Sequence, residues 1–305
     1  MRETAVTVHT GDDTPLGGTL TLPEGTGPFP ATLILHGSGP LDRDGNAPRI
    51  KADLGPALAS ALAREGMASL RYDRRGTGST PGDWRTCGYF DNRTDAAAAV
   101  QLLKSHADID PDGVGVIGHS EGALHAMGLA AGGDVAAAVV LAGYARSGES
   151  ALSHQVRSVR ESLPAPLRLP GRLIAASGLP SRLLNRIKAG SADRERIAGG
   201  WVNARWMREM LAHDTREDLA SIRVPVLAVT GGKDLQVDPD DLEEIARLVQ
   251  GEVETHRPAD LTHLLRRTPS EPTLLSYRRL LREPVDPGLL TLVTTWLRPR
   301  LTGTP

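Results

Sequence analysis

Short apolar runs alternate with helical patterns along most of the chain. The runs are five to seven residues long, rich in Val, Ile, Leu and Ala, and indicate buried strands, whereas the intervening segments repeat apolar residues at helical spacing. The predicted strands lie at residues 5–9, 16–22, 31–35, 67–72, 113–117, 135–141, 225–230 and 253–257. The predicted helices lie at residues 54–65, 93–105, 121–131, 239–249 and 287–297. The first two strands form a hairpin, and the alternation after them predicts an α/β fold with a mostly parallel central sheet flanked by helices.

The alternation stops between residues 145 and 220, where no convincing strand pattern is found. Prolines at positions 164, 166, 170 and 180 divide this stretch. Two helices are predicted from apolar spacing, one by Leu152, Val156, Val159 and Leu163 and one by Trp201, Trp206, Met210 and Leu211. We therefore expect residues 145–220 to form a helical lid inserted into one α/β core built from residues 1–144 and 221–305.

Composition narrows the classes of function. Of the 305 residues 40% are hydrophobic, which is enough for a real core, and the net charge of −2 gives no electrostatic reason to expect nucleic acid. The one cysteine, Cys87, excludes an internal disulfide and a cysteine-rich metal site. No signal segment follows Met1, and the longest apolar stretch, residues 135–142, is too short to span a bilayer. We expect a cytoplasmic protein without a membrane span, metal or organic cofactor.

The pentapeptide Gly118-His119-Ser120-Glu121-Gly122 lies where the predicted strand 113–117 turns into the predicted helix 121–131. A G-x-S-x-G sequence in that context is typical of a sharp turn that lifts a nucleophilic serine above the sheet. The two glycines let the strand and the helix pass close together. The alternative is a Gly-rich turn whose serine only caps the helix.

A serine hydroxyl needs a base, usually a histidine oriented by a carboxylate. On a parallel sheet these groups are expected just after strand carboxyl ends. Asp234 follows the strand 225–230, and His263 lies in the loop after the strand 253–257. The chain order is then Ser120, Asp234, His263, as in an α/β-hydrolase.

Other acidic and histidine residues compete less well for these two roles. Asp238, Asp240 and Asp241 open a predicted helix, where carboxylates serve the helix dipole, and Asp260 shares the loop of His263. Among the histidines, His36 and His119 lie at strand ends, His256 lies within a predicted strand, and His213 lies in the insertion.

An oxyanion intermediate needs two N–H donors. The backbone N–H of Glu121 is one candidate, and the loop after the strand 31–35 supplies the other. Ser38 is the first choice there and Gly39 the second. The alternative is that this loop is a plain Gly/Pro turn.

Three motifs together carry a resemblance. They are His36-Gly-Ser-Gly-Pro-Leu-Asp-Arg-Asp-Gly-Asn46, Leu70-Arg-Tyr-Asp-Arg-Arg-Gly-Thr-Gly-Ser79 and Gly118-His-Ser-Glu-Gly122. The sequence resembles the serine-dependent α/β-hydrolase superfamily, and within it a bacterial esterase group related to dienelactone hydrolases and acyl-peptidase catalytic domains. The resemblance implies Ser120 as nucleophile, Asp234 as acid and His263 as base, with the insertion where the superfamily carries its lid.

Some polar residues in these motifs have two interpretations. Asp42, Arg43 and Asp44 either form ion pairs that fix the oxyanion loop, which we favour, or touch substrate. Arg74 and Arg75 are expected to brace the loop below the site, and the Glu121 side chain either serves the helix start or contacts substrate.

The predicted function is cleavage of a carboxylic ester of a small or medium acyl group through an acyl-Ser120 intermediate. Alternatives are a thioesterase, an acyltransferase or a lactone-forming or lactone-cleaving enzyme using the same intermediate, and more remotely a non-catalytic binding protein. The expected partner is a small-molecule ester or thioester, and the oligomeric state is left open. Trp201, Trp206 and Met210 of the insertion are predicted to line the acyl pocket.

Overall fold

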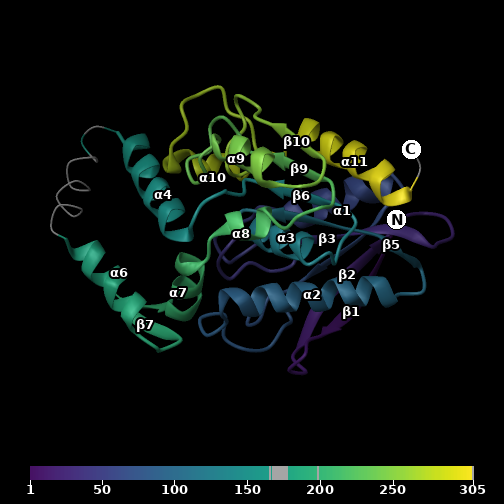
Figure 1. Cartoon of the computed structure of the whole chain (residues 1–305), viewed down its shortest axis with the longest axis horizontal. Coiled ribbons are helices and arrows are strands. Elements are labelled where there is room, and N and C mark those ends of the chain that lie inside the picture. Colours follow the sequence, from purple (N-terminus) through teal and green to yellow (C-terminus); the bar gives the residue numbers. More distant parts are fainter. Residues whose placement is uncertain (165, 167–177, 198, 304–305) are drawn as a thin grey trace.

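An eight-stranded sheet runs through the computed structural model, which describes residues 1–164, 166, 178–197 and 199–303 (Figure 1). The strands in spatial order are β1 (Arg2–His9), β2 (Pro15–Leu22), β4 (Ala68–Tyr72), β3 (Phe29–Leu35), β5 (Ile109–His119), β6 (Ala138–Leu141), β9 (Val226–Val229) and β10 (Val253–His256). The hairpin β1–β2 and the pair β2–β4 are antiparallel. All other neighbours from β4 to β10 are parallel. The predicted α/β fold with a mostly parallel sheet is therefore confirmed.

Helices cover both faces of this sheet because the strand side chains alternate between two buried clusters. In β3, Leu33 and Leu35 join one cluster, and Ile34 between them joins the other. The first cluster packs under α2 (Tyr89–Ser105), α3 (Glu121–Ala131) and α9 (Asp241–Leu248), and the second under α1 (Leu54–Arg64) and α11 (Pro287–Thr302). A turn of 3₁₀ helix (Leu274–Ser276) and α10 (Tyr277–Leu280) precede α11. With both faces covered by helices, the free ends of the sheet are its edges of loops. Because the strands are parallel, their carboxyl ends lie at one edge, and a site can form there.

All predicted core strands and helices are present, with small differences at their ends. One of them is in α2, which begins four residues earlier than expected. The carboxylate of Asp91 accepts the backbone N–H of Gly88 at 2.9 Å, so the helix has a cap that apolar spacing does not reveal.

Residues 145–220 are mostly helical but not entirely so. They contain α4 (Gly148–Ser162), α6 (Leu179–Ala189), α7 (Ala204–Ala212) and α8 (Thr215–Leu219), and Figure 1 shows α4, α6 and α7 at one end of the molecule. Between α6 and α7, β7 (Arg194–Ile197) and β8 (Gly200–Asn203) form an antiparallel hairpin. The expectation of no strand in this stretch is therefore wrong, and Trp201 lies in β8 rather than in a helix. Pro170 lies outside the described residues.

The β7–β8 hairpin forms without the apolar alternation by which strands are predicted. Its turn uses Gly199 at φ +85°, a conformation open to glycine. Apart from the buried polar Asn203, its strand residues are exposed or half-buried, so they carry no apolar alternation toward a core. As for membranes, no helix within the described ranges has the length and apolar character needed to cross a bilayer.

Candidate active site

Ser120 occupies a strained turn between β5 and α3. Its φ of 56° and ψ of −119° are unusual for a residue with a side chain. A Cβ on Gly118 would collide with the carbonyl oxygen of Gly122, and a Cβ on Gly122 would collide with the carbonyl of Leu35. The Ser120 N–H donates to Leu141 O on β6 at 2.9 Å, which ties the turn to the sheet. Two glycines and a neighbouring strand thus hold the serine at the carboxyl edge of the sheet.

Three of the predicted site residues form one hydrogen-bonded chain. His263 Nε2 lies 3.2 Å from Ser120 Oγ, and His263 Nδ1 lies 2.8 Å and 3.0 Å from the two carboxylate oxygens of Asp234. The Asp234 carboxylate also accepts the backbone N–H groups of Gln236 and Val237 at 2.7 Å and 2.9 Å. Because the carboxylate takes a proton donor at Nδ1, the Nε2 lone pair of neutral His263 faces the serine hydroxyl.

Two further histidines hold the backbone around this chain. The ring Nε2 of His119 lies 2.8 Å from His263 O, and that of His36 lies 2.7 Å from Arg43 O, so each is assigned as the N–H donor. Burial lowers the pKa of His119 to about 3 and that of His36 to about 4. Both are therefore neutral near pH 7 and position backbone, in agreement with the supporting roles expected from their strand-end positions.

These depressed values predict an acid-sensitive fold. In the unfolded chain His36 and His119 bind protons with the ordinary histidine pKa of 6.5, whereas in the folded chain burial lowers both pKa values. The unfolded chain therefore binds more protons below pH 6.5, and the free energy of unfolding falls as the pH falls. At pH 5 each histidine lowers the free energy of unfolding by about 2 kcal/mol relative to pH 7. We expect the melting temperature to be several degrees lower at pH 5 than at pH 7. A His119→Gln variant should show a shallower dependence, and a melting temperature equal at the two pH values would contradict the assignment.

The loop after β3 lies directly beside Ser120. A Cβ built on Gly37 would stand 3.3 Å from Ser120 Cβ, so a side chain at position 37 would crowd the serine. Ser38, Ser120, Glu121 and His263 line one cavity together. Gly39, the second choice for an oxyanion donor, lines a neighbouring cavity instead.

The Glu121 side chain is buried in a polar network. Its Oε1 accepts from Asn92 Nδ2 at 3.1 Å, lies 3.0 Å from His125 Nε2, and forms an ion pair with Arg74 at 3.3 Å. Burial would raise the pKa of Glu121, but Arg74, His125 and the indole of Trp206 outweigh it and hold the pKa at about 2. Arg74 also donates to His36 O at 2.7 Å. A single guanidinium thus connects the Ser120 turn to the loop that carries Ser38.

The Asp42-Arg43-Asp44 cluster forms ion pairs within the protein. The Arg43 guanidinium pairs with Asp73, whose carboxylate also accepts the Arg43 backbone N–H at 2.8 Å. Asp44 pairs with Arg71 at 2.9 Å. Asp42 accepts the backbone N–H of Asp44 at 3.0 Å and closes a turn. These contacts agree with the favoured interpretation that the cluster fixes the loop.

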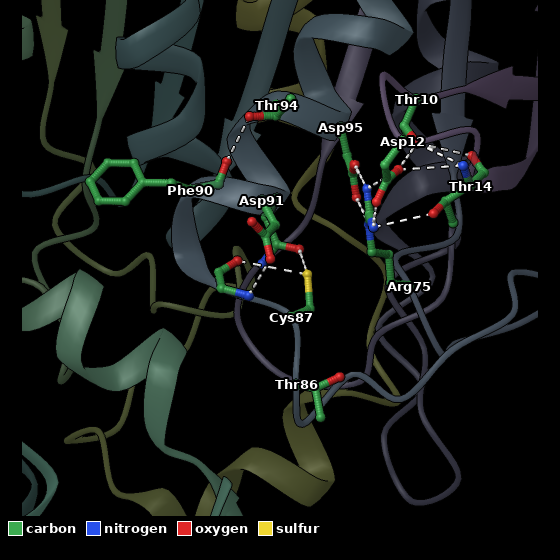
Figure 2. A network of polar contacts seen from close by, with 12 residues as sticks. Thr10, Asp12, Thr14, Arg75, Thr86, Cys87, Phe90, Asp91, Thr94 and Asp95 are labelled. Atoms are coloured by element: carbon green, nitrogen blue, oxygen red, sulfur yellow. Dashed lines mark hydrogen bonds and ion pairs between the residues drawn. The ribbon is translucent and has the colours of Figure 1, made fainter. Parts of the chain in front are cut away.

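Arg75 forms two ion pairs, which agree with the bracing role expected of it. Figure 2 shows its guanidinium between the carboxylates of Asp12 and Asp95, at 2.7 Å from each. The buried Cys87 thiol donates a hydrogen bond to Asn92 Oδ1, 3.2 Å away, and burial raises the pKa of the thiol to about 12. The cysteine is therefore protonated and packed rather than reactive.

The competing acids and histidines are engaged elsewhere. Each forms an ion pair or hydrogen bond with a group other than Ser120. The pairs are Asp238 and Asp241 with Arg146, Asp240 with Arg257, Asp260 with Arg267, His213 with Asp218, and His256 with Glu254.

A family model described as serine aminopeptidase, S33, matches residues 54–267, which is more than half of the chain. The chain belongs to this family. The S33 match covers the Ser120 turn, Asp234 and His263, and it confirms the resemblance to serine-dependent α/β-hydrolases.

Individual proteins share sequence or fold with this chain. The chain is 26% identical over 291 residues to a protein named Esterase EstD from Thermotoga maritima, and the match covers 92% of this chain and 65% of EstD. A structure of Est1E from Butyrivibrio proteoclasticus with ferulic acid bound superposes with a TM-score of 0.62 at 18% identity, over 98% of this chain and 99% of Est1E. The α/β-hydrolase GrgF from Penicillium sp. sh18 superposes with a TM-score of 0.66 at 17% identity, over 99% of this chain and 100% of GrgF. At these identities the two structures show a shared fold.

Cavities surround Ser120 in this S33 chain. An apolar cavity of about 80 Å³ reaches from Ser120 toward α4 and α7, and Trp206 and Met210 line it. That this cavity receives the acyl group stays a prediction. Trp206 also borders a second chamber of about 280 Å³, which Trp201 lines. Trp201 therefore contributes to the chamber beyond Trp206 and not to the cavity at the serine. The lining residues that sequence reasoning missed are Leu124, Ala142, Tyr144, Gly148, Ala151, Leu152, Gln155, Gln236 and Val237.

Tyr144 and Gln236 did carry a signal, since each follows the carboxyl end of a strand. As to metals, no three His, Cys, Asp or Glu side chains among residues 1–164, 166, 178–197 and 199–303 gather in a way that would bind an ion. The expectation that no cofactor is needed stays a prediction.

Proposed function

We propose that this protein is a serine hydrolase that cleaves a carboxylic ester of a small or medium acyl group. The observation that carries the proposal is the hydrogen-bonded chain from Ser120 through His263 to Asp234, mounted on a strained strand–helix turn. Family membership and the names of EstD and Est1E agree with it. The chain spans 65% of the length of EstD.

In the first half-reaction Ser120 Oγ attacks the ester carbonyl carbon while His263 Nε2 takes the hydroxyl proton. Asp234 stabilises the imidazolium that forms and keeps it oriented. The backbone N–H groups of Glu121 and Ser38, with Gly39 as second choice, hold the negatively charged oxygen of the tetrahedral intermediate. The C–O bond then breaks, and His263 gives its proton to the departing alcohol.

In the second half-reaction a water molecule attacks the acyl-Ser120 carbonyl. His263 takes a proton from that water and returns it to Ser120 Oγ as the acid leaves. The enzyme returns to its starting protonation state, and one ester plus one water gives one acid and one alcohol.

Arg74 has an electrostatic role in this proposal. The Glu121 carboxylate lies in the same turn as the proposed oxyanion donor, and a buried negative charge there would oppose the developing oxyanion. The Arg74 guanidinium pairs with it at 3.3 Å and offsets that charge. The pair therefore lets a carboxylate occupy this position at limited cost to the transition state.

Residues 145–220 act as the lid in this account. Trp206 and Met210 from α7 and Leu152 from α4 give the cavity at Ser120 an apolar wall, which suits an acyl chain. The segment carries a net charge of +5, whereas the whole chain carries −2. Most of these cations are expected to face water.

Hydrolysis of 4-nitrophenyl esters with acyl chains of increasing length tests the proposal. The small cavity predicts a preference for short chains in the wild type. Trp206→Ala joins this cavity to the 280 Å³ chamber and should shift the preference to longer chains by changing kcat/KM several-fold, with little change in melting temperature. Product analysis with a competing alcohol distinguishes hydrolysis from acyl transfer.

Trp201→Ala is the matched control, because Trp201 is 51% exposed and absent from the lining at the serine. Its acyl-chain profile should resemble that of the wild type. An unchanged profile in Trp206→Ala would mean that the segment does not line the acyl pocket, and its helices would then be better explained as an interface between subunits.

A further inference from the structure

A cleft of about 390 Å³ leaves Ser120 on a different path from the apolar cavity. Ser120 and His263 lie in its wall, together with Arg49, Ile50 and Arg278. An outer cavity of about 1010 Å³ shares Arg49, Ile50 and Arg278 with this cleft, so the two form one route from the serine to the surface. A carbonyl carbon at Ser120 would thus have one substituent in the apolar cavity and the other in this route.

The route is lined by an excess of positive charge. Arg49, Lys51, Arg85, Arg278 and Arg282 line the outer cavity against one acid, Asp42. The Asp42 carboxylate is occupied by backbone N–H groups of its own turn, and Arg85 pairs with Asp83.

The four remaining cations are Arg49, Lys51, Arg278 and Arg282. None of them has an ion-pair partner in the described part of the chain, whereas Arg43, Arg74 and Arg75 each pair with a carboxylate. These four come from two segments more than 200 residues apart in sequence, the loop before α1 and the α10 region. Like charges gathered without carboxylates repel one another, and an anionic ligand would relieve that repulsion.

We propose that this outer cavity binds an anionic group, a carboxylate or a phosphate, carried on the alcohol part of the ester. The inference rests on the proposed function, because it needs the carbonyl at Ser120 and the acyl chain in the apolar cavity. Guanidinium forks from Arg49, Arg278 and Arg282 suit both anions, which accept paired N–H donors. The large, cationic route is suited to an extended polar leaving group, and the small apolar cavity is not.

A pair of chromogenic esters tests this. They are the butanoates of 3-hydroxy-4-nitrobenzoate and of the uncharged 3-hydroxy-4-nitrobenzamide, which share the acyl group and the phenol. In the wild type, kcat/KM for the charged ester should exceed that for the uncharged one by about tenfold at low salt, and raised salt should shrink this ratio. The double variant Arg49→Glu/Arg278→Glu should bring the ratio to about one or below. A phenol carrying a phosphate in place of the carboxylate distinguishes the two anions.

Arg223→Glu is the matched control. Arg223 is exposed and precedes the amino end of β9, at the sheet edge opposite Ser120, so the same change of charge there should leave the ratio unaltered. Using a ratio cancels any general loss of activity in a variant. A wild-type ratio of one, or an equal fall of the ratio in Arg223→Glu, would overturn the anion site.

The two proposals fail separately. Turnover of the uncharged ester reports on the hydrolase function, and the ratio reports on the anion site. If neither ester is hydrolysed, binding of 3-hydroxy-4-nitrobenzoate to Ser120→Ala still decides the question. It should bind more tightly than the benzamide and be weakened by Arg49→Glu/Arg278→Glu, and equal binding of the two would again overturn the site.

Discussion

Replacing Ser120 with alanine is expected to lower kcat/KM for a 4-nitrophenyl ester by about 10⁴-fold or more, because the attacking oxygen is removed. The fold should survive, since serine and alanine both carry a Cβ and the positive φ of 56° is equally strained for each. Without the hydroxyl, His263 Nε2 also loses its 3.2 Å contact with Ser120 Oγ. Steady-state kinetics and thermal melting of the purified variant provide the measurement.

Residual turnover is expected to be close to the background hydrolysis of the ester. A variant that melts with the wild type and keeps near wild-type kcat/KM would rule out Ser120 as the nucleophile. A variant that loses both activity and its melting transition would show a folding defect, and Ser120→Cys then gives a second nucleophile-replacing change at the same turn.

Asp234→Asn is expected to lower kcat by about 10⁴-fold. The amide presents an N–H toward His263 Nδ1, which must then be unprotonated to accept it. The neutral ring therefore carries its proton on Nε2, facing Ser120, where a base is needed. The neutral side chain also no longer stabilises the imidazolium. Since Asp234 is buried and accepts two backbone N–H groups, its conservative replacement changes charge and tautomer with little change of shape.

Asp238→Asn is the control for this change. Asp238 pairs with Arg146 at 3.0 Å, away from the His263 ring, so its replacement should alter activity only a few-fold. If Asp238→Asn were the damaging substitution and Asp234→Asn the mild one, the carboxylate of the site would be misassigned.

The sequence was sufficient for the core of the fold because periodicity follows burial. Strands such as β6 and β9 are buried on both faces and read as continuous apolar runs, and the helices between them show apolar spacing. The proximity of Ser120, Asp234 and His263 was predictable because strand ends meet at one edge of a parallel sheet, so position along the chain implied position in space. The β7–β8 hairpin was not predictable in this way, because its strands face solvent and bury no regular set of side chains.

Interactions between distant segments lay beyond sequence reasoning. The ion pair of Arg74 with Glu121 and the contact of His119 with the His263 backbone depend on how the loops fold over the sheet. The same holds for the cationic route, whose arginines come from two segments that carry no shared pattern. Each of these polar side chains was visible in the sequence, but its partner was not.

Covalent labelling with a fluorophosphonate probe tests the central claim most directly, because the probe reacts with a serine that a neighbouring base activates. The account predicts one label per chain, found by peptide mass spectrometry on Ser120, absent from Ser120→Ala and formed much more slowly in Asp234→Asn. A folded wild-type protein that takes up no label, or takes it up on a residue other than Ser120, would contradict the account.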